Sequence, residues 1–343
     1  MTMLSRRIIL GSCGAALICM TAAGNMLPQS ATGLMPLKVT LAREFSKKQI
    51  LDVSPDGKKL CFENWGDAKH PMDVVELGTW KTIFSGSFQT RVWFAGFFSG
   101  SRSLIVETRL TPTKGKNISH LTHIDLHTGK RTEGQPAPNS PCDDNPVTAL
   151  ADGILLVDDI NWKSIAKCSL LLVEFPTCRE IASVPFTIKA NAAEQTSRAN
   201  SRTAISNDRS VFVYTYANTL VCRRSKDLKV LWTQNISPLT DVYEIATSSN
   251  GSHVAIATAN HKVWLENREY SISIYDGETG SNIARFAVSG TDGIAISPDG
   301  RLLAVAEIIN DRTQKQYFTV VHVCDARSGA ILVSFEHDRL RWQ

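Results

Sequence analysis

Apolar and polar residues alternate along most of this 343-residue chain, in short runs separated by clusters of turn-forming residues. Alternation with a period of two is typical of β-strands, and these windows show no helical period. The runs are grouped in fours, and the clearest group comprises Gly293 to Ser297, Arg301 to Ile308, Phe318 to Asp325 and Ala330 to Phe335. The pattern therefore predicts repeated units of four strands.

Two kinds of turn punctuate each unit. Between the first and second runs, Ser54-Pro55-Asp56-Gly57 recurs as Ser297-Pro298-Asp299-Gly300, with altered copies at Ser206-Asn207-Asp208-Arg209 and Ser248-Ser249-Asn250-Gly251. Proline fixes φ, serine and aspartate bond nearby backbone, and glycine tolerates a positive φ, so this tetrapeptide predicts a tight hairpin. A second turn, after the third run, has Asp, then Thr or Ser, then Gly, as in Asp276 to Gly280, Asp325 to Gly329 and Asp125 to Gly129.

The first turns number six, near Gly57, Gly100, Gly153, Arg209, Gly251 and Gly300. Their spacing is typical of β-propeller blades. We therefore predict an all-β fold: a single β-propeller of six four-stranded blades, with seven as the alternative. The strand Leu37 to Glu44 lies outside the six units and either pairs with the last blade or belongs to a degraded seventh. Lys130 to Pro146 and Lys189 to Ser201 are predicted to be loops.

The run from Ile294 through Ser297-Pro298-Asp299-Gly300 to Ala306, followed by a strand ending in Asp, resembles the blades of WD-repeat and YVTN-type β-propellers. The resemblance extends from Leu37 to the C-terminus. It departs from the strict WD repeat, because Tyr275-Asp276 and Cys324-Asp325 stand where Trp-Asp would be. Similar exported propellers include quinoprotein-like dehydrogenase subunits and lactonases, so the resemblance leaves an enzyme or cofactor-binding subunit as an alternative function.

The N-terminus has the pattern of an export signal. Ser5-Arg6-Arg7 precedes an apolar run that ends in small residues at Ala22 to Gly24. This pattern predicts a secretory signal over residues 1–24, of general or twin-arginine type, then a linker over 25–36 and the propeller over 37–343. We expect export to the periplasm or surface of a bacterium. A retained membrane anchor is the rival interpretation.

The net charge bears on the kind of partner, and the cysteines bear on disulfide formation. The formal net charge of +4 is too weak to indicate nucleic-acid binding. Cys61, Cys222 and Cys324 lie in predicted strands, where a thiol acts as a small buried hydrophobe. Cys168 and Cys178 bracket one extended strand, which holds them beyond bridging distance. The sequence leaves open the disulfide state of Cys61, Cys142, Cys168, Cys178, Cys222 and Cys324.

The candidate catalytic and metal-binding groups are sparse. His120, His123 and His127 straddle a predicted strand, whose alternation places the first two on opposite faces. The acidic pairs Asp143-Asp144 and Asp158-Asp159 lie in sequence that predicts solvated loops. The usual hydrolase, metalloprotease and nucleotide-binding motifs are missing. We therefore predict no catalytic residue, no metal site and no cofactor.

The loops that join second and third strands are longer than the turns, and they carry tryptophans beside cationic residues. Long loops on a rigid scaffold usually bind partners, and exposed Trp with Arg is typical of interfaces. The sequence thus predicts a non-catalytic scaffold that binds a protein, peptide or glycan, with packing of the blade edge as the alternative role. Membrane contact is expected only through a retained N-terminus. The candidate binding face comprises Trp65, His70, Lys114, Lys116, Trp162, Lys163, His261, Lys262, Trp264, Arg268, Arg312 and Lys315.

Overall fold

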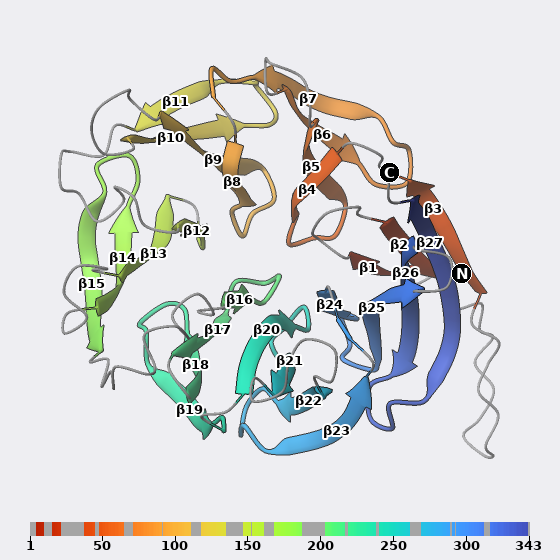
Figure 1. Cartoon of the computed structure of the whole chain (residues 1–343). Helices are drawn as coiled ribbons and strands as arrows, with labels where there is room; N and C mark the ends of the chain where they lie inside the picture. Colours follow the sequence, from red (N-terminus) through yellow and green to blue (C-terminus); the bar gives the residue numbers. More distant parts are fainter. Residues whose placement is uncertain are drawn as a thin grey trace, which may run out of the picture.

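A computed structural model shows a ring of β-sheets around a central axis (Figure 1). It describes residues 5–9, 16–21, 38–44, 48–64, 71–90, 92–110, 118–134, 147–151, 153–160, 168–186, 203–216, 219–237, 240–260, 269–288, 290–291, 293–311 and 316–341; described side chains lie within residues 51–334. All regular structure in these ranges is β-strand. None of the described residues forms a helix that could span a membrane.

Six sheets contain four strands each and are called blades 1 to 6 here. Blade 1 comprises β4 (Lys48–Val53), β5 (Lys59–Asn64), β6 (Pro71–Glu76) and β7 (Thr82–Ser87). Blade 2 comprises β8 (Val92–Phe97), β9 (Ser103–Leu110), β10 (Ile118–Asp125) and β11 (Arg131–Gly134). Blade 3 comprises β12 (Val147–Ala149), β13 (Ile154–Ile160), β14 (Cys168–Glu174) and β15 (Arg179–Phe186).

The second half of the ring repeats this plan. Blade 4 comprises β16 (Thr203–Ile205), β17 (Val211–Tyr216), β18 (Thr219–Arg224) and β19 (Val230–Asn235). Blade 5 comprises β20 (Thr240–Thr247), β21 (His253–Asn260), β22 (Tyr270–Asp276) and β23 (Asn282–Val288). Blade 6 comprises β24 (Gly293–Ile296), β25 (Leu302–Asp311), β26 (Gln316–Asp325) and β27 (Ile331–Arg341).

Every blade is an antiparallel meander of four strands that are consecutive in the sequence. The first strand of each blade lies nearest the axis and the fourth lies at the rim (Figure 1). This arrangement confirms the predicted β-propeller with six four-stranded blades. Because each blade is complete in itself, β24–β27 needs no strand from the N-terminus.

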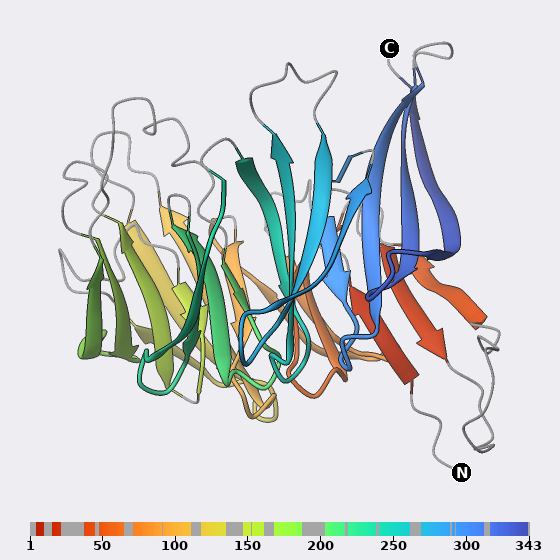
Figure 2. The ribbon, with the colours of Figure 1, turned by 90° about the horizontal axis from the view of Figure 1, so that it is seen from below.

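A smaller sheet lies between blade 6 and blade 1 (Figure 1, Figure 2). It contains β1 (Ser5–Ile9), β2 (Ala16–Thr21) and β3 (Lys38–Glu44), in that order. The predicted strand Leu37 to Glu44 is therefore present as β3, but it pairs with β2 and not with the last blade. The prediction that residues 1–24 are an export signal remains a prediction, although these residues include β1 and β2.

The alternation of each strand divides the core into layers between blades. In β5, Cys61 packs with residues of blade 2, whereas its neighbours Leu60 and Phe62 face the opposite side of the sheet. In β25, Leu303 likewise packs toward blade 5. Burying each such side chain contributes about 1.5–3 kcal/mol, so the stacking of blades holds the ring together.

Two stretches predicted as loops contain strand. Arg131–Gly134 is the fourth strand of blade 2, although Lys130 to Pro146 was expected to be loop. This strand lies at the rim, where three of its four side chains are exposed, so no apolar alternation marks it. Asp158 and Asp159 lie in β13, because its pairing with β14 continues to Ile160. Lys189 to Ser201 and Asp143-Asp144 lie outside the described residues.

Candidate functional site

The compact turns of all six blades lie on one edge of the ring. We call the turn between the first and second strands the first turn, and the turn between the third and fourth strands the third turn. In each blade a backbone N–H of the third turn donates to a carbonyl at or beside the first turn, at 2.6–3.0 Å. The pairs are Leu77 with Lys58, Leu126 with Arg102, Phe175 with Gly153, Ser225 with Ser210, Gly277 with Ser252, and Ala326 with Arg301. This repeated bond ties the two turns of each blade together, so the second-to-third connections leave from the opposite edge.

The predicted chemistry of both turns is observed. Gly57, Gly251 and Gly300 have φ of 66°, 69° and 72°, the left-handed conformation that glycine favours. In the third turn, the Oδ1 atom of Asp276 accepts the backbone N–H groups of Glu278 and Thr279 at 3.1 and 2.8 Å. These bonds lower the pKa of Asp276, and related bonds lower the pKa of Asp125 and Asp325.

In the sequence, the predicted binding residues belong to the connections between second and third strands. β5 ends at Asn64 and β6 begins at Pro71, while β21 ends at Asn260 and β22 begins at Tyr270. The candidate residues in these and the equivalent connections all lie outside the described residues. They are Trp65, His70, Lys114, Lys116, Trp162, Lys163, His261, Lys262, Trp264, Arg268, Arg312 and Lys315.

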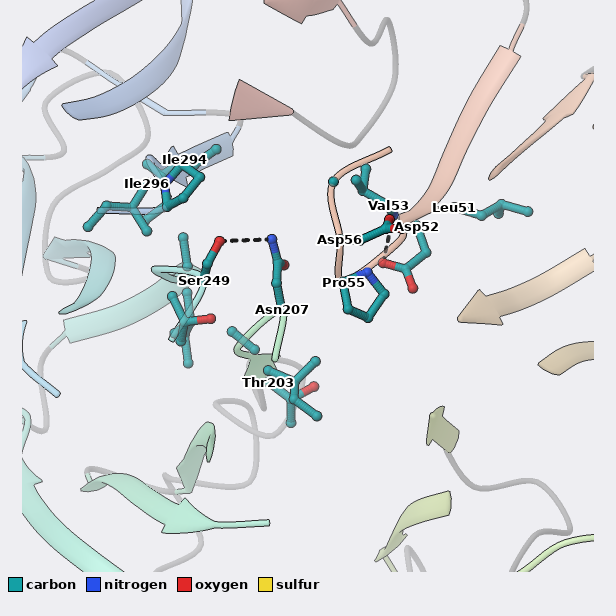
Figure 3. A pocket seen from close by; sticks show the side chains of 18 of the residues that line it. Leu51, Asp52, Val53, Pro55, Asp56, Thr203, Asn207, Ser249, Ile294 and Ile296 are labelled. Atoms are coloured by element: carbon teal, nitrogen blue, oxygen red, sulfur yellow. Dashed lines mark hydrogen bonds between the residues drawn. The ribbon is translucent and has the colours of Figure 1, made fainter. Parts of the chain in front are cut away.

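A cavity of about 680 Å³ lies at the centre of the ring, on the side of the compact turns (Figure 3). The first strands of blades 1, 4, 5 and 6 form its walls. Aliphatic side chains such as Val53, Ile294 and Ile296 line part of these walls, as the apolar first strands predicted. Polar groups lie at its turn end, where the amide of Asn207 donates to Ser249 Oγ at 3.3 Å.

One ion pair crosses the centre beside this cavity. Arg209 Nη2 of blade 4 lies 2.9 Å from Asp52 Oδ2 of blade 1 and donates to the carbonyl of Phe97 in blade 2 at 2.8 Å. The same carboxylate accepts the N–H groups of Phe97 and Val53, both at 2.8 Å. Burial raises the pKa of Asp52 despite the attraction of Arg209. This carboxylate is thus engaged in structural bonds, and the pair fastens three blades together.

Sequence reasoning missed Arg209 because it stands at a first-turn position that is glycine in four of the six blades, at Gly57, Gly153, Gly251 and Gly300. Its φ is 60°, which disfavours a side chain. Ser101, the equivalent residue of blade 2, has φ of 56°, and its Oγ accepts the N–H of Asp56 from blade 1 at 3.1 Å. Both exceptions to glycine therefore bond another blade. The replacement of glycine in an otherwise regular repeat was the sequence signal that could have indicated these contacts.

The remaining candidate groups are histidines and cysteines, and their surroundings are those of structural residues. His120 and His123 lie three positions apart in β10, and His127 lies in the following turn. The ring of His123 lies 5.7 Å from that of Phe98 and 5.9 Å from that of Phe175. Among the described cysteines, Cys61, Cys178, Cys222 and Cys324 are buried free thiols. The described residues contain no cluster of three metal-ligating side chains.

Comparison with known proteins identifies the fold. No protein-family model matches the sequence, and no curated protein matches it. The β-propeller domain of Swd1 from Myceliophteria thermophila is 11% identical, covers 83% of this chain and 84% of its own, and has a TM-score of 0.52. A mitotic checkpoint complex chain is 13% identical, with 86% and 83% covered and a TM-score of 0.51. The chain shares the β-propeller fold of these proteins.

The same fold is also similar to that of an enzyme. Hydrazine synthase from Kuenenia stuttgartiensis is 13% identical, with 81% of this chain and 76% of that chain covered and a TM-score of 0.51. At such identities the likeness concerns the fold alone, and one fold supports both binding and catalysis. Function must therefore be argued from the surfaces of the propeller.

Proposed function

We propose that this protein is a non-catalytic propeller scaffold, exported to the envelope of a bacterium, that binds a protein, peptide or glycan through its long-loop edge. The observation that carries the proposal is the backbone hydrogen bond between the two turns of a blade, which recurs in all six blades. It commits one edge of the ring to compact structure, so the second and third strands of each blade are joined from the other edge, by longer connections in every blade except blade 4. Binding residues usually lie on such connections above a rigid scaffold.

The central site supports binding in preference to acid–base chemistry. General acid–base catalysis requires a carboxyl group that can reach a substrate proton. Both oxygens of Asp52 already accept bonds from the backbone or Arg209. The export prediction rests on Ser5-Arg6-Arg7 and the apolar run that follows them.

A pull-down from the native cell, with chemical crosslinking, tests the proposal. We expect Trp264→Ala, or Lys114→Glu with Lys116→Glu, to weaken partner capture about tenfold, the loss typical of one interface anchor of about 1.4 kcal/mol. The melting temperature should stay nearly unchanged. Ile331→Ser, at an exposed position on the rim of blade 6, provides a matched control that should capture normally.

Two results would contradict this proposal. A fall in melting temperature with unchanged capture would mean that these residues pack the blade edge. Stoichiometric metal or a positive quinone stain on the purified protein would favour the alternative, a quinoprotein-like or lactonase-like propeller.

A further inference from the structure

The junction between blade 6 and blade 1 differs from the other five junctions of the ring. Five apolar clusters join neighbouring blades, from the pair 1–2 through to the pair 5–6. Two further clusters of described side chains each belong to a single blade. One lies on blade 6 and the other on blade 1, on the faces that these blades turn toward each other across the junction.

These two faces form apolar walls. On β25, Leu302, Ala304 and Ala306 point away from blade 5, since the alternate residues pack toward it. On β5, Leu60 and Phe62 point away from blade 2. The five wall side chains are at most 7% exposed. Something therefore covers both walls.

The first turn of blade 1 has open space where the first turns of blades 5 and 6 meet their preceding blades. A Cβ added at Gly251 would lie 2.1 Å from Val211 of the preceding blade, and one added at Gly300 would lie 2.1 Å from His253 of its preceding blade. Gly57 occupies the same turn position in blade 1. A Cβ there would meet no atom within 4 Å. Blade 6 is thus not packed on the turn of blade 1 in the way that blades 4 and 5 are packed on their successors.

The sheet β1–β3 lies in this sector, with β1 against β24 of blade 6 (Figure 1, Figure 2). A strand between two apolar walls buries both of its faces, and such strands have runs of consecutive apolar residues. The sequence of β2, Ala-Leu-Ile-Cys-Met-Thr, has this character. Both β1 and β2 belong to the segment that is predicted to be removed on export, whereas β3 would remain.

We propose that the sector between blades 6 and 1 is a strand-acceptor site, filled by β1 and β2 in the whole chain and by a β-hairpin of a partner protein after processing. This inference rests on the proposed export. Loss of β1 and β2 would uncover two apolar walls and the β2-facing edge of β3 (Lys38–Glu44). Exposed apolar patches and unpaired strand edges are sites of association, and strand addition supplies backbone hydrogen bonds. The partner hairpin has at least one strand of consecutive apolar residues, as β2 does.

A nicked form of the full chain tests this site. A protease recognition sequence is placed between residue 24 and β3, the folded protein is cut, and a fluorescent peptide of residues 1–24 is added. We expect the labelled peptide to replace the cut fragment and to co-elute with the propeller at one peptide per protein. A scrambled peptide of identical composition should bind at least about tenfold more weakly, because it cannot match strand and walls together.

Wall variants locate the bound peptide. Leu302→Glu should reduce peptide uptake by at least about tenfold, whereas Ile331→Glu, on the exposed rim of the same blade, should not. If Leu302→Glu fails to fold, the comparison of native and scrambled peptides still decides the matter. Equal uptake of the native and scrambled peptides would overturn the proposal, and so would unchanged uptake by folded Leu302→Glu.

Three further outcomes would also overturn it. The cut fragment could leave without lowering the melting temperature and without peptide uptake, which would mean that the ring closes on itself. A dimeric mass after cutting would show that a second copy fills the sector. Residues 1–24 still present in the exported protein would remove the need for a partner hairpin. Failure of the loop-edge pull-down, by contrast, would contradict only the proposed function, because that surface lies elsewhere.

Discussion

Arg209 and Asp52 lie 157 positions apart in the sequence, yet their side chains meet at 2.9 Å across the centre of the ring. The arginine side chain is 7% exposed and the aspartate side chain 24% exposed. Removing one member of such an ion pair lowers stability, because the other charged group stays buried without a partner of opposite charge. The pair therefore fixes the relative position of blades that no single sheet connects.

Removing Arg209 should destabilise the protein, because the carboxylate of Asp52 would lose its charged partner. We expect Arg209→Gly to lower the free energy of unfolding by about 2 kcal/mol, less than a fully buried pair would lose, because Asp52 is partly solvated and glycine relieves the left-handed backbone. Adding Asp52→Asn should recover part of the loss. Urea unfolding of the four proteins in a double-mutant cycle measures the coupling, and additive effects would contradict it.

Gly300 and Gly57 form a matched pair for separating backbone strain from crowding. Both have left-handed φ, but only at Gly300 would a Cβ meet a neighbour, the His253 ring at 2.1 Å. We expect Gly57→Val to cost about 1–2 kcal/mol from φ alone and Gly300→Val to cost clearly more. Thermal unfolding provides the comparison. Equal losses at both sites would show that crowding by His253 is absent.

The aspartates of the third turns predict acid sensitivity. Hydrogen bonds hold the pKa of Asp276 and Asp325 below the ordinary value, so each contributes stability above about pH 4 that is lost as the pH falls through the lowered folded-state pKa. Asp276→Asn keeps an acceptor oxygen but removes the titration. Between pH 5 and pH 2.5, its urea midpoint should therefore fall less than that of the unmodified protein. Parallel curves would contradict this assignment.

The buried cysteines should be unreactive in the folded protein. Burial raises the pKa of Cys222 to about 12 and of Cys324 to about 11, and it raises the pKa of Cys61 well above its usual range. Because the thiolate is the reactive form, alkylation at pH 8 should label these three only on unfolding. Peptide mass mapping with and without urea measures each site. Rapid labelling of Cys222 in the native protein would show that blades 4 and 5 separate locally.

Much of this fold could be predicted from the sequence because its turn chemistry is local. The Ser-Pro-Asp-Gly tetrapeptides and the Asp-to-Gly turns dictate their own backbone geometry, and their order fixes the four-stranded blade. The strand Arg131–Gly134 escaped prediction because its pairing partner, and not its own polar side chains, makes it a strand.

The centre of the ring could not be predicted in the same way. The contact between Arg209 and Asp52 depends on how blades 1 and 4 are placed across the axis, which no local pattern encodes. The strands in the sector between blades 6 and 1 could not be predicted for a related reason. The apolar run that indicates an export signal also suits a strand between two apolar walls, and the sequence alone does not separate these roles.

The completeness of each four-stranded blade has a mechanical consequence. Among the described strands, none is shared by the first and last blades, so a force that pulls these blades apart meets no described sheet that joins them. Under such a load the outermost sheets should peel away one at a time, each giving its own step in extension, as in an array of stacked repeats.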